Sequence, residues 1–460
     1  MDAYTDLLLR RSVSAPSRGI DQIPDLHPGM FGYQRDVTSF LLNAGSGAAF
    51  LDTGLGKSLV ALEWGRIVAE ETGKPVLMLA PLAVAPQHVR EAHKFGLEAQ
   101  VVRDQSEVLP GVNVTNYAKV EHFDPSTFGG VILDESSIVK NFTGSTSRKL
   151  ISMFANTPFR LACTATPAPN DHMELGQHSQ FLGVMPSNEM LSRWFIADQN
   201  NMGRYRLKGH AVKPFWNWVA SWARCISKPS DLGYPDDGFI LPRLNLHRHV
   251  VAADVSIGAE DMLFRIPETS ATSIHREKRL TADQRAEKIA DIVNAEKGEA
   301  WVIWCDTDYE ADALVARVDD AVEVRGSMTD SMKEERLVDF SEGRSRVIVS
   351  KPSIAGFGLN WQHCARVAFV GLSFSYESFY QAVRRCWRFG QTREVECHIA
   401  MADTERNIWD VISRKSGDHE AMKTEMYAAM KRAHEIREIK IDYQPKQPLR
   451  LPAWIEERAA

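Results

Sequence analysis

The stretch from Phe50 to Ser58, FLDTGLGKS, constrains the fold of this chain more than any other. The apolar run at 48–51 is typical of a buried strand end, and the sequence from Leu59, LVALEWGRIVAE, is apolar at helical spacing. Between them, Gly54 and Gly56 allow backbone N–H groups to turn toward an anion, and the helix N-terminus adds positive potential. Strand, glycine loop and helix together predict a phosphate-binding loop in an α/β protein.

The lysine and serine that end this stretch match the chemistry of such a loop. Lys57 is expected to reach the β and γ phosphates of a nucleotide, and Ser58 to hold Mg²⁺. The full pattern requires a glycine five residues before Gly56, and Leu51 stands there instead. Taken alone, the stretch is therefore also compatible with an ordinary glycine turn that caps a helix.

Composition sets broad limits on the class of protein. A chain of 460 residues holds two or three domains. The sequence contains no apolar run near the roughly 18 residues of a membrane span, and its N-terminus does not resemble a secretory signal. Six scattered cysteines without a CxxC pair indicate a reducing compartment and argue against a zinc site. Because the net charge is −6, a nucleic-acid surface has to be local.

Buried-strand patterns recur between about residues 30 and 185, and the most informative one ends in two acids. The apolar run Gly130–Leu133 is followed by Asp134 and Glu135. At the carboxyl end of a parallel strand these acids face the crevice where ligands bind. Asp134 is a candidate to hold Mg²⁺ through water, and Glu135 is a candidate to polarise an attacking water. The alternative is a pair of solvent-facing acids at a strand end.

A glutamine lies just upstream of the glycine loop. Gln34 follows Phe31-Gly32-Tyr33 at the start of a helical pattern, and its two-faced amide is able to read an adenine edge. An exposed glutamine at a helix start is the plain alternative.

Residues 186–250 interrupt the strand–helix rhythm. Nine Lys or Arg and four Asp lie between Arg193 and Arg248, together with Trp194, Trp216, Trp218 and Trp222. Basic residues interleaved with aromatic ones suit phosphate contact combined with base stacking. The alternative is a small helical insert with a tryptophan core and a solvated basic face, and the two interpretations are compatible.

A second α/β domain is expected from about residue 268, where a long charged helix to Lys297 leads into the strand 300–305. It has no phosphate loop of its own. Near its end, Gln381, Arg385 and Arg388 stand at i, i+4 and i+7, which places them on one helical face. Arginines on a facing domain can reach a γ-phosphate across a cleft, although an arginine-rich helix is more often a solvated face. The residues after 403 are expected to be helical to about 440.

Taken in order over roughly residues 30–415, these stretches resemble the superfamily-two helicases, specifically the Swi/Snf-like translocases and their short bacteriophage-type members. The stretches that carry the resemblance are GYQ (32–34), DTGLGKS (52–58), LAPLAVAPQ (79–87), VTNY (114–117), DESS with the following Lys140-Asn141, TAT (164–166), 353–360 and 381–391. In this family the first glycine of the loop is not needed, which removes the objection raised by Leu51.

The resemblance implies two tandem RecA-like parallel-sheet lobes with a helical basic insert between them and a C-terminal helical tail. The implied boundaries are an N-terminal arm at 1–28, the ATP-binding lobe at 29–185, the insert and linker at 186–267, the second lobe at 268–415 and the tail at 416–460. It also implies ATP as substrate and Mg²⁺ as metal.

The same resemblance assigns roles to residues. The implied catalytic residues are Lys57, Glu135 as general base, Arg388 as arginine finger and Arg385 as the second finger candidate. The implied nucleotide-binding residues are Gln34, Thr53, Gly54, Leu55, Gly56, Lys57, Ser58, Asp134, Gly356, Gly358 and Gln381, with Ser58 and Asp134 on the metal. The implied nucleic-acid residues are Pro81, Thr115, Asn116, Thr164, Thr166, Ser353 and Asn360, to which the basic insert adds Arg204, Arg206 and Lys208.

Two residues depart from the family pattern. Ser137 replaces the residue that often links the acidic motif to the TAT motif, although its hydroxyl is still able to bond Thr164 or Thr166. Arg384 stands where the family often has an acid, which is expected to add positive charge near the cleft.

These inferences predict an ATP-dependent DNA helicase or translocase that serves replication, recombination or repair in the cytoplasm of a bacterial or phage-infected cell. Its partners are then DNA, bound through the backbone, and replication or recombination proteins, with no membrane. The alternatives are an RNA helicase of the same superfamily and a nucleotide-regulated DNA-binding module with weak ATPase activity.

Overall fold

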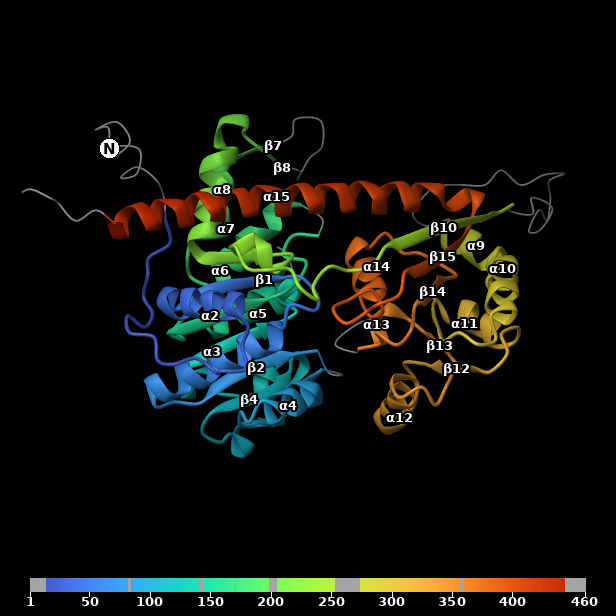
Figure 1. The fold of residues 1–460 in the computed structure, drawn as a ribbon, viewed down its shortest axis with the longest axis horizontal. Coiled ribbons are helices and arrows are strands. Elements are labelled where there is room, and N and C mark those ends of the chain that lie inside the picture. The colour runs from blue at the N-terminus through green and yellow to red at the C-terminus, as the bar shows by residue number, and fades with distance from the viewer. Residues whose placement is uncertain are drawn as a thin grey trace, which may run out of the picture.

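The computed structural model describes residues 14–81, 84–140, 144–169, 171–197, 205–252, 274–355 and 360–442. Two parallel β-sheets, each with its own helices, form two lobes, and one long helix runs along both of them (Figure 1). This arrangement confirms the predicted fold of two tandem RecA-like lobes. Gly356, Gly358 and Arg204, which the sequence named as site residues, lie outside the described residues.

The first lobe is built on a seven-stranded parallel sheet with the order β3-β4-β2-β5-β6-β1-β9. Its strands are β1 (Ser46–Leu51), β2 (Val76–Ala80), β3 (Ala99–Val101), β4 (Val112–Asn116), β5 (Gly130–Asp134), β6 (Phe159–Cys163) and β9 (Ala223–Ile226). Because all the strands are parallel, their carboxyl ends meet at one edge. The glycine loop after β1 and the acids at the end of β5 therefore lie on either side of β6.

Helices cover both faces of this sheet. They are α2 (Gly32–Ala44), α3 (Lys57–Thr72), α4 (Ala85–Lys94), α5 (Ser145–Met153), α6 (Leu175–Phe181), α7 (Ser187–Trp194) and α8 (Val212–Trp222). A short antiparallel hairpin, β7 (Phe195–Ala197) with β8 (Tyr205–Leu207), stands out from α7 and α8 (Figure 1). The described part of the N-terminal arm is tied down, since the backbone N–H groups of residues 18–20 donate to the carbonyls of residues 42–44.

The predicted insert contributes to the sheet of the first lobe. Strand β9 pairs with β1 from Ala48–Ala223 to Leu51–Ile226, so this lobe extends beyond the boundary expected at residue 185. Trp216, Trp218 and Trp222 are at most 1% exposed and join the core of the lobe. A fully buried indole has no free face, so these tryptophans are core residues and not a platform for bases.

The second lobe has a six-stranded parallel sheet with the order β10-β15-β14-β11-β13-β12. Its strands are β10 (Leu244–Val251), β11 (Trp301–Trp304), β12 (Ala321–Val324), β13 (Val347–Ser350), β14 (Arg366–Phe369) and β15 (Val395–Ala402). Its helices are α9 (Ile274–Leu280), α10 (Ala282–Ala295), α11 (Asp308–Val315), α12 (Asp330–Ser341), α13 (Pro352–Ala355) and α14 (Tyr376–Val383). Strand β10 comes from the predicted linker and pairs with β15, so this lobe starts before the expected boundary at 268.

The expected C-terminal tail is a brace across both lobes. Helix α15 (Arg406–Asp442) runs along the second lobe and continues over the first (Figure 1). Ile408 and Ile412 pack into the core of the second lobe, whereas Met422 and Met426 pack into the core of the first. Among the described residues, no helix has both the length and the apolar character needed to cross a membrane.

Candidate active site

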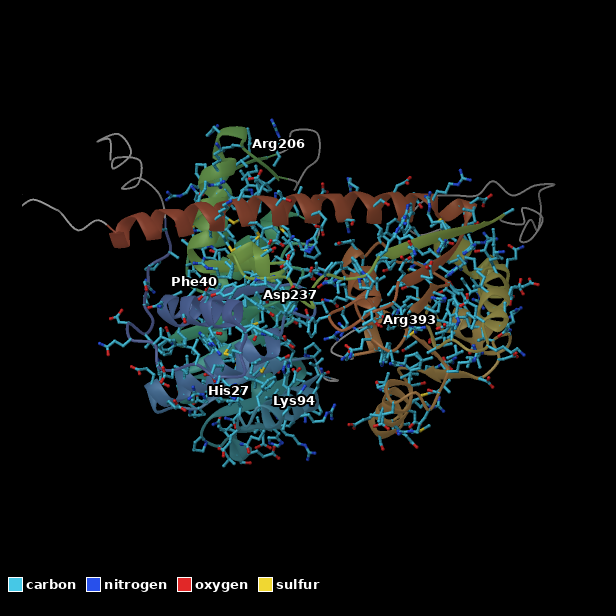
Figure 2. The ribbon with its side chains drawn as sticks, viewed as in Figure 1. His27, Phe40, Lys94, Arg206, Asp237 and Arg393 are labelled. Carbon is cyan, nitrogen blue, oxygen red and sulfur yellow. The ribbon has the colours of Figure 1, made fainter. Side chains whose placement is uncertain are left out.

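A cavity of about 370 Å³ lies between the two lobes, and most of the residues that the sequence assigned to a nucleotide line it. The lining residues among those assignments are Gln34, Thr53, Gly54, Gly56, Lys57, Ser58, Asp134 and Glu135 from the first lobe, and Arg385 and Arg388 from the second. The structure thus brings together the glycine loop, the strand-end acids and the arginines. Asp237, labelled in Figure 2, lies on the segment that joins the lobes beside this region.

The glycine loop has the backbone of an anion-binding turn. Gly54 and Gly56 have φ values of +94° and +73°, which only glycine adopts without strain. Gly56 directly precedes α3, so the helix begins at Lys57, and its first residues line the cavity with the positive end of the helix dipole. The amine of Lys57 donates to the carbonyl of Leu51 at 2.9 Å, which folds the lysine back over its own loop.

Two side chains of α2 hold this loop in place. The amide nitrogen of Gln34 and the hydroxyl of Tyr33 both donate to the carbonyl of Leu55 at 3.0 Å. The amide oxygen of Gln34 accepts from the backbone N–H of Phe31 at 2.9 Å. Both ends of the amide are therefore engaged inside the protein, so Gln34 positions the loop in this conformation and does not present a free amide to a base. The role of Tyr33 was not expected from the sequence.

The first strand-end acid has a histidine partner. The Nε2 atom of His88, on α4, lies 2.8 Å from Oδ2 of Asp134, and both residues are buried. Burial lowers the pKa of His88, but the Asp134 carboxylate more than offsets this, so the pKa lies above its usual value. Burial likewise raises the pKa of Asp134, and His88 more than reverses that effect. Sequence reasoning missed His88 because its partner is 46 residues away.

The second acid is the strained one. Glu135 has φ of +51°, a left-handed conformation that is uncommon for any residue except glycine. Burial raises its pKa to about 7, and the charge of Asp134 adds to the effect while Lys57 and Arg385 oppose it. Its carboxylate accepts from the hydroxyl of Thr164 at 3.5 Å. A glutamate with a pKa near neutrality in a cavity is suited to general base catalysis.

The link between the acidic motif and the TAT motif differs from the expected one. The Ser137 hydroxyl donates to the Glu135 carbonyl at 3.5 Å instead of bonding Thr164 or Thr166. Thr166 donates to the carboxylate of Glu377, on α14, at 3.4 Å. The same carboxylate forms an ion pair with Lys140. Contact between the two motifs therefore runs through Glu135, and Glu377 of the second lobe joins it.

The arginines reach the cavity from turns. Helix α14 ends at Val383, so the prediction that Arg385 and Arg388 share a helical face with Gln381 is wrong. Arg385 is 3% exposed, and its Nε donates to the Gln381 carbonyl at 3.2 Å. Burial lowers the pKa of Arg385 to about 10, with a further contribution from Arg388, so the guanidinium stays charged at neutral pH. Arg388 is half-buried and also lines the cavity.

The sequence suggested that Arg384 adds positive charge near the cleft, but its guanidinium is paired with an acid. Its guanidinium lies 2.7 Å from the carboxylate of Asp52, the residue that precedes Thr53 in the glycine loop. It also donates to the Thr53 carbonyl at 3.1 Å.

A second cavity of about 540 Å³ opens on the same edge of the first sheet. Pro81 and Asn116, both expected to contact nucleic acid, line it together with Lys140 and Glu377. Thr115, Thr164 and Thr166 are at most 1% exposed, so they make no contact with nucleic acid in this conformation. Thr115 lies on the buried strand β4, and Thr164 and Thr166 follow the end of the buried strand β6.

The remaining nucleic-acid candidates are scattered. Ser353 is exposed on α13, whereas Asn360 lines the first cavity. The amine of Lys208 donates to two carbonyls at the end of α7, which gives it a structural role. Arg206 is exposed on the hairpin that stands out from the first lobe (Figure 2).

Comparison with known proteins agrees with this architecture. Residues 284–390 match the helicase conserved C-terminal domain. This match lies within the second lobe and agrees with its parallel α/β fold. No curated protein sequence matches the chain.

Two solved structures are similar to this chain. One is a fragment described as an HsdR subunit of a type I restriction enzyme from Vibrio vulnificus, at 14% identity and a TM-score of 0.53, covering 84% of this chain and 66% of that one. The other is the SWI2/SNF2 ATPase core of Sulfolobus solfataricus in complex with double-stranded DNA, at 17% identity and a TM-score of 0.42, covering 89% of this chain and 99% of that one.

Proposed function

We propose that this chain is an ATP-dependent translocase or helicase that moves along DNA. One observation carries the proposal. A single cavity is lined by the glycine loop and acids of one lobe and by the arginines of the other. This is the arrangement needed to hydrolyse a nucleotide between two lobes and to convert hydrolysis into their relative movement.

The substrate end of the cavity suits ATP. The backbone N–H groups of the glycine loop and the start of α3 are placed to receive phosphate oxygens. Lys57 lines the cavity and supplies the positive charge for the β and γ phosphates. The residues also fit Mg²⁺, since Ser58 and Asp134 offer oxygen donors to the same cavity. When bound, Mg²⁺ neutralises charge on the phosphates.

The catalytic roles follow from position and charge. Glu135, with its pKa of about 7, takes a proton from the attacking water. Arg388 stabilises the charge that develops on the transferred phosphoryl group, and Arg385 lies beside it. The contacts of Gln381 with Glu135 and of Glu377 with Thr166 couple the second lobe to the chemistry.

We place the nucleic acid at the carboxyl-end edge of the first sheet, where Pro81 and Asn116 line the second cavity. The proposed setting is replication, recombination or repair in a bacterial or phage-infected cell. The choice of DNA rests on the resemblance of the sequence motifs to Swi/Snf-like translocases.

The test is the rate of ATP hydrolysis with single-stranded DNA, duplex DNA and RNA of equal length, with Glu135→Gln as the inactive control. Stimulation by either form of DNA is the expected result. Stimulation by RNA alone would assign the chain to the RNA helicases. Absence of hydrolysis with all three would support a nucleotide-regulated binding module instead.

A further inference from the structure

The carboxylate of Asp52 is the meeting point of three parts of the chain. Arg384, from the turn after α14, lies 2.7 Å from its Oδ1 atom. Lys423, from the brace helix α15, lies 3.3 Å from its Oδ2 atom. The hydroxyl of Tyr380, on α14, donates to Oδ1 as well. Asp52 is 8% exposed, and both cations are 4% exposed, so water does not screen these contacts.

The cluster carries more positive than negative charge. Two cations face one carboxylate, and the pKa of Asp52 lies well below its usual range: burial opposes this shift, but Arg384 and Lys423 more than offset it. His419 lies against the ring of Tyr380, and burial lowers its pKa to about 3, so it is neutral at pH 7. The carboxylate of Glu420 is 3.5 Å from Lys423, but its side chain is 64% exposed.

The ring of Tyr380 helps to hold this surplus charge. The guanidinium of Arg384 and the amine of Lys423 lie 5.6 and 5.4 Å from its centroid. An aromatic face attracts cations at this range. The two cations are therefore fixed by Asp52 and Tyr380 together, and each of them links a different segment to the same carboxylate.

In both lobes, the residues of this cluster are sequence neighbours of residues proposed to act on the nucleotide. Asp52 directly precedes Thr53 and Gly54 of the phosphate loop, and its carboxylate accepts from the Thr53 N–H at 2.6 Å. Arg384 directly precedes Arg385, which is one of the two arginines that line the cavity. A Cβ on Gly54 would lie 2.9 Å from the backbone nitrogen of Phe389, so loop and turn are already in close contact.

We propose that Arg384 and Lys423 are positioning residues for the ATP hydrolysis proposed above, and that they act through Asp52. They fix the phosphate loop against the turn that carries Arg385 and Arg388. Because Lys423 belongs to α15, the C-terminal helix is a working part of the hydrolytic site and not only a scaffold between the lobes. This inference rests on the proposed function.

The test compares Lys423→Met, which keeps the length of the side chain and removes its charge, with Lys423→Arg, which keeps the charge. Lys431→Met is the matched control, since Lys431 is exposed on the same helix. With DNA present, Lys423→Met and Arg384→Gln are expected to lower kcat for ATP about 10- to 100-fold, with KM changed by less than about threefold. Lys423→Arg is expected to keep kcat within about threefold of wild type, and the control to match wild type.

A double-substitution comparison separates positioning from plain destabilisation. Asp52→Asn leaves two buried cations without their acid, so adding Lys423→Met to it is expected to restore thermal stability but not kcat. Thermal unfolding checks that each variant is folded at the assay temperature. Wild-type kcat in folded Lys423→Met would overturn the inference. Increased DNA-independent hydrolysis in this variant would also overturn it, because the cluster would then restrain hydrolysis instead of supporting it. A wild-type protein that hydrolyses no ATP would overturn the proposed function instead.

Discussion

The amide nitrogen of Gln381, at the end of α14, lies 3.4 Å from the carboxylate of Glu135 in the other lobe. The group proposed as general base is thus contacted by a neutral donor from the facing lobe as well as by Thr164 of its own lobe. Replacing the carboxylate by an amide of the same shape removes the basic group but leaves the packing between the lobes.

We therefore expect Glu135→Gln to bind ATP with nearly wild-type affinity and to hydrolyse it poorly, because phosphate and metal contacts remain while the base is lost. Lys57→Ala is the contrasting variant and is expected to lose both affinity and turnover, since Lys57 supplies charge to the phosphates. Binding of a fluorescent nucleotide and steady-state release of phosphate measure the two properties. Normal turnover in Glu135→Gln would contradict the assignment of Glu135 as the general base.

The raised pKa of Glu135 predicts a pH dependence. A base has to be ionised, and burial brings this pKa to about 7. We expect kcat to rise between about pH 6 and pH 8 and to level off above that range. A profile that is flat over this range would show that another group controls the reaction.

The same residue predicts an opposite trend for stability. The folded state binds the Glu135 proton more tightly than the unfolded state, whose pKa has the ordinary value of 4.5. The contribution of this group to the free energy of unfolding is therefore largest at low pH and is lost as the pH rises from 4.5 to about 7. Glu135→Gln is expected to melt at a higher temperature than wild type at pH 8, with a smaller difference at pH 5, as measured by calorimetry.

The sequence predicted the parts of the site whose signals are local. A glycine loop between an apolar strand and a helix, and acids after an apolar run, are each read within about ten residues. The helix face for Arg385 and Arg388 was wrong because α14 stops at Val383, where the chain turns toward the glycine loop. Spacing alone does not show where a helix ends when packing against the other lobe decides it.

Relationships across long separations were not predicted. Asp52 meets Arg384 and Lys423 only because two lobes and a terminal helix fold together. The joining of β9 to β1 is similarly non-local, and it moved residues from the expected insert into the first sheet. The sequence offered one usable signal for the brace: apolar residues Met422, Met426 and Met430 recur on one face of α15. That pattern shows a buried face but not its partner.

The arginine finger gives a prediction with a large expected effect. A cation that meets transition-state charge is worth about 10³–10⁵ in rate in phosphoryl transfer. Arg388→Ala is expected to reduce DNA-stimulated turnover by a factor in this range, with a modest loss of ATP affinity. Arg388→Lys is expected to recover only part of the rate, because the planar guanidinium is lost. If Arg385→Ala loses DNA-stimulated turnover while Arg388→Ala nearly keeps it, Arg385 is the arginine finger and Arg388 is not.

The region between α7 and β9 has a buried tryptophan core and an exposed basic surface, and separate substitutions test the role of each. Trp218 is fully buried, with its ring centroid 4.6 Å from that of Trp194 and 5.4 Å from that of Trp222. Trp218→Ala leaves a large cavity, and we expect it to cost about 3–5 kcal/mol of stability and to lower the melting temperature. DNA affinity of the fraction that remains folded is expected to stay unchanged, because the indole is not on the surface.

Arg206 and Lys213 are the exposed counterpart, and Arg206 projects from the hairpin beyond the body of the first lobe (Figure 2). Lys208 is left out of the test because its amine is bound to backbone carbonyls. If both exposed cations contact DNA phosphates, replacing them by glutamine flattens the log–log salt slope of DNA binding by about 1.5, and this is the expected result. The DNA concentration needed to stimulate hydrolysis should rise, while DNA-independent hydrolysis stays constant. An unchanged slope in a well-folded double variant would leave this region as scaffold and would confine DNA contact to the edge where Pro81 and Asn116 lie.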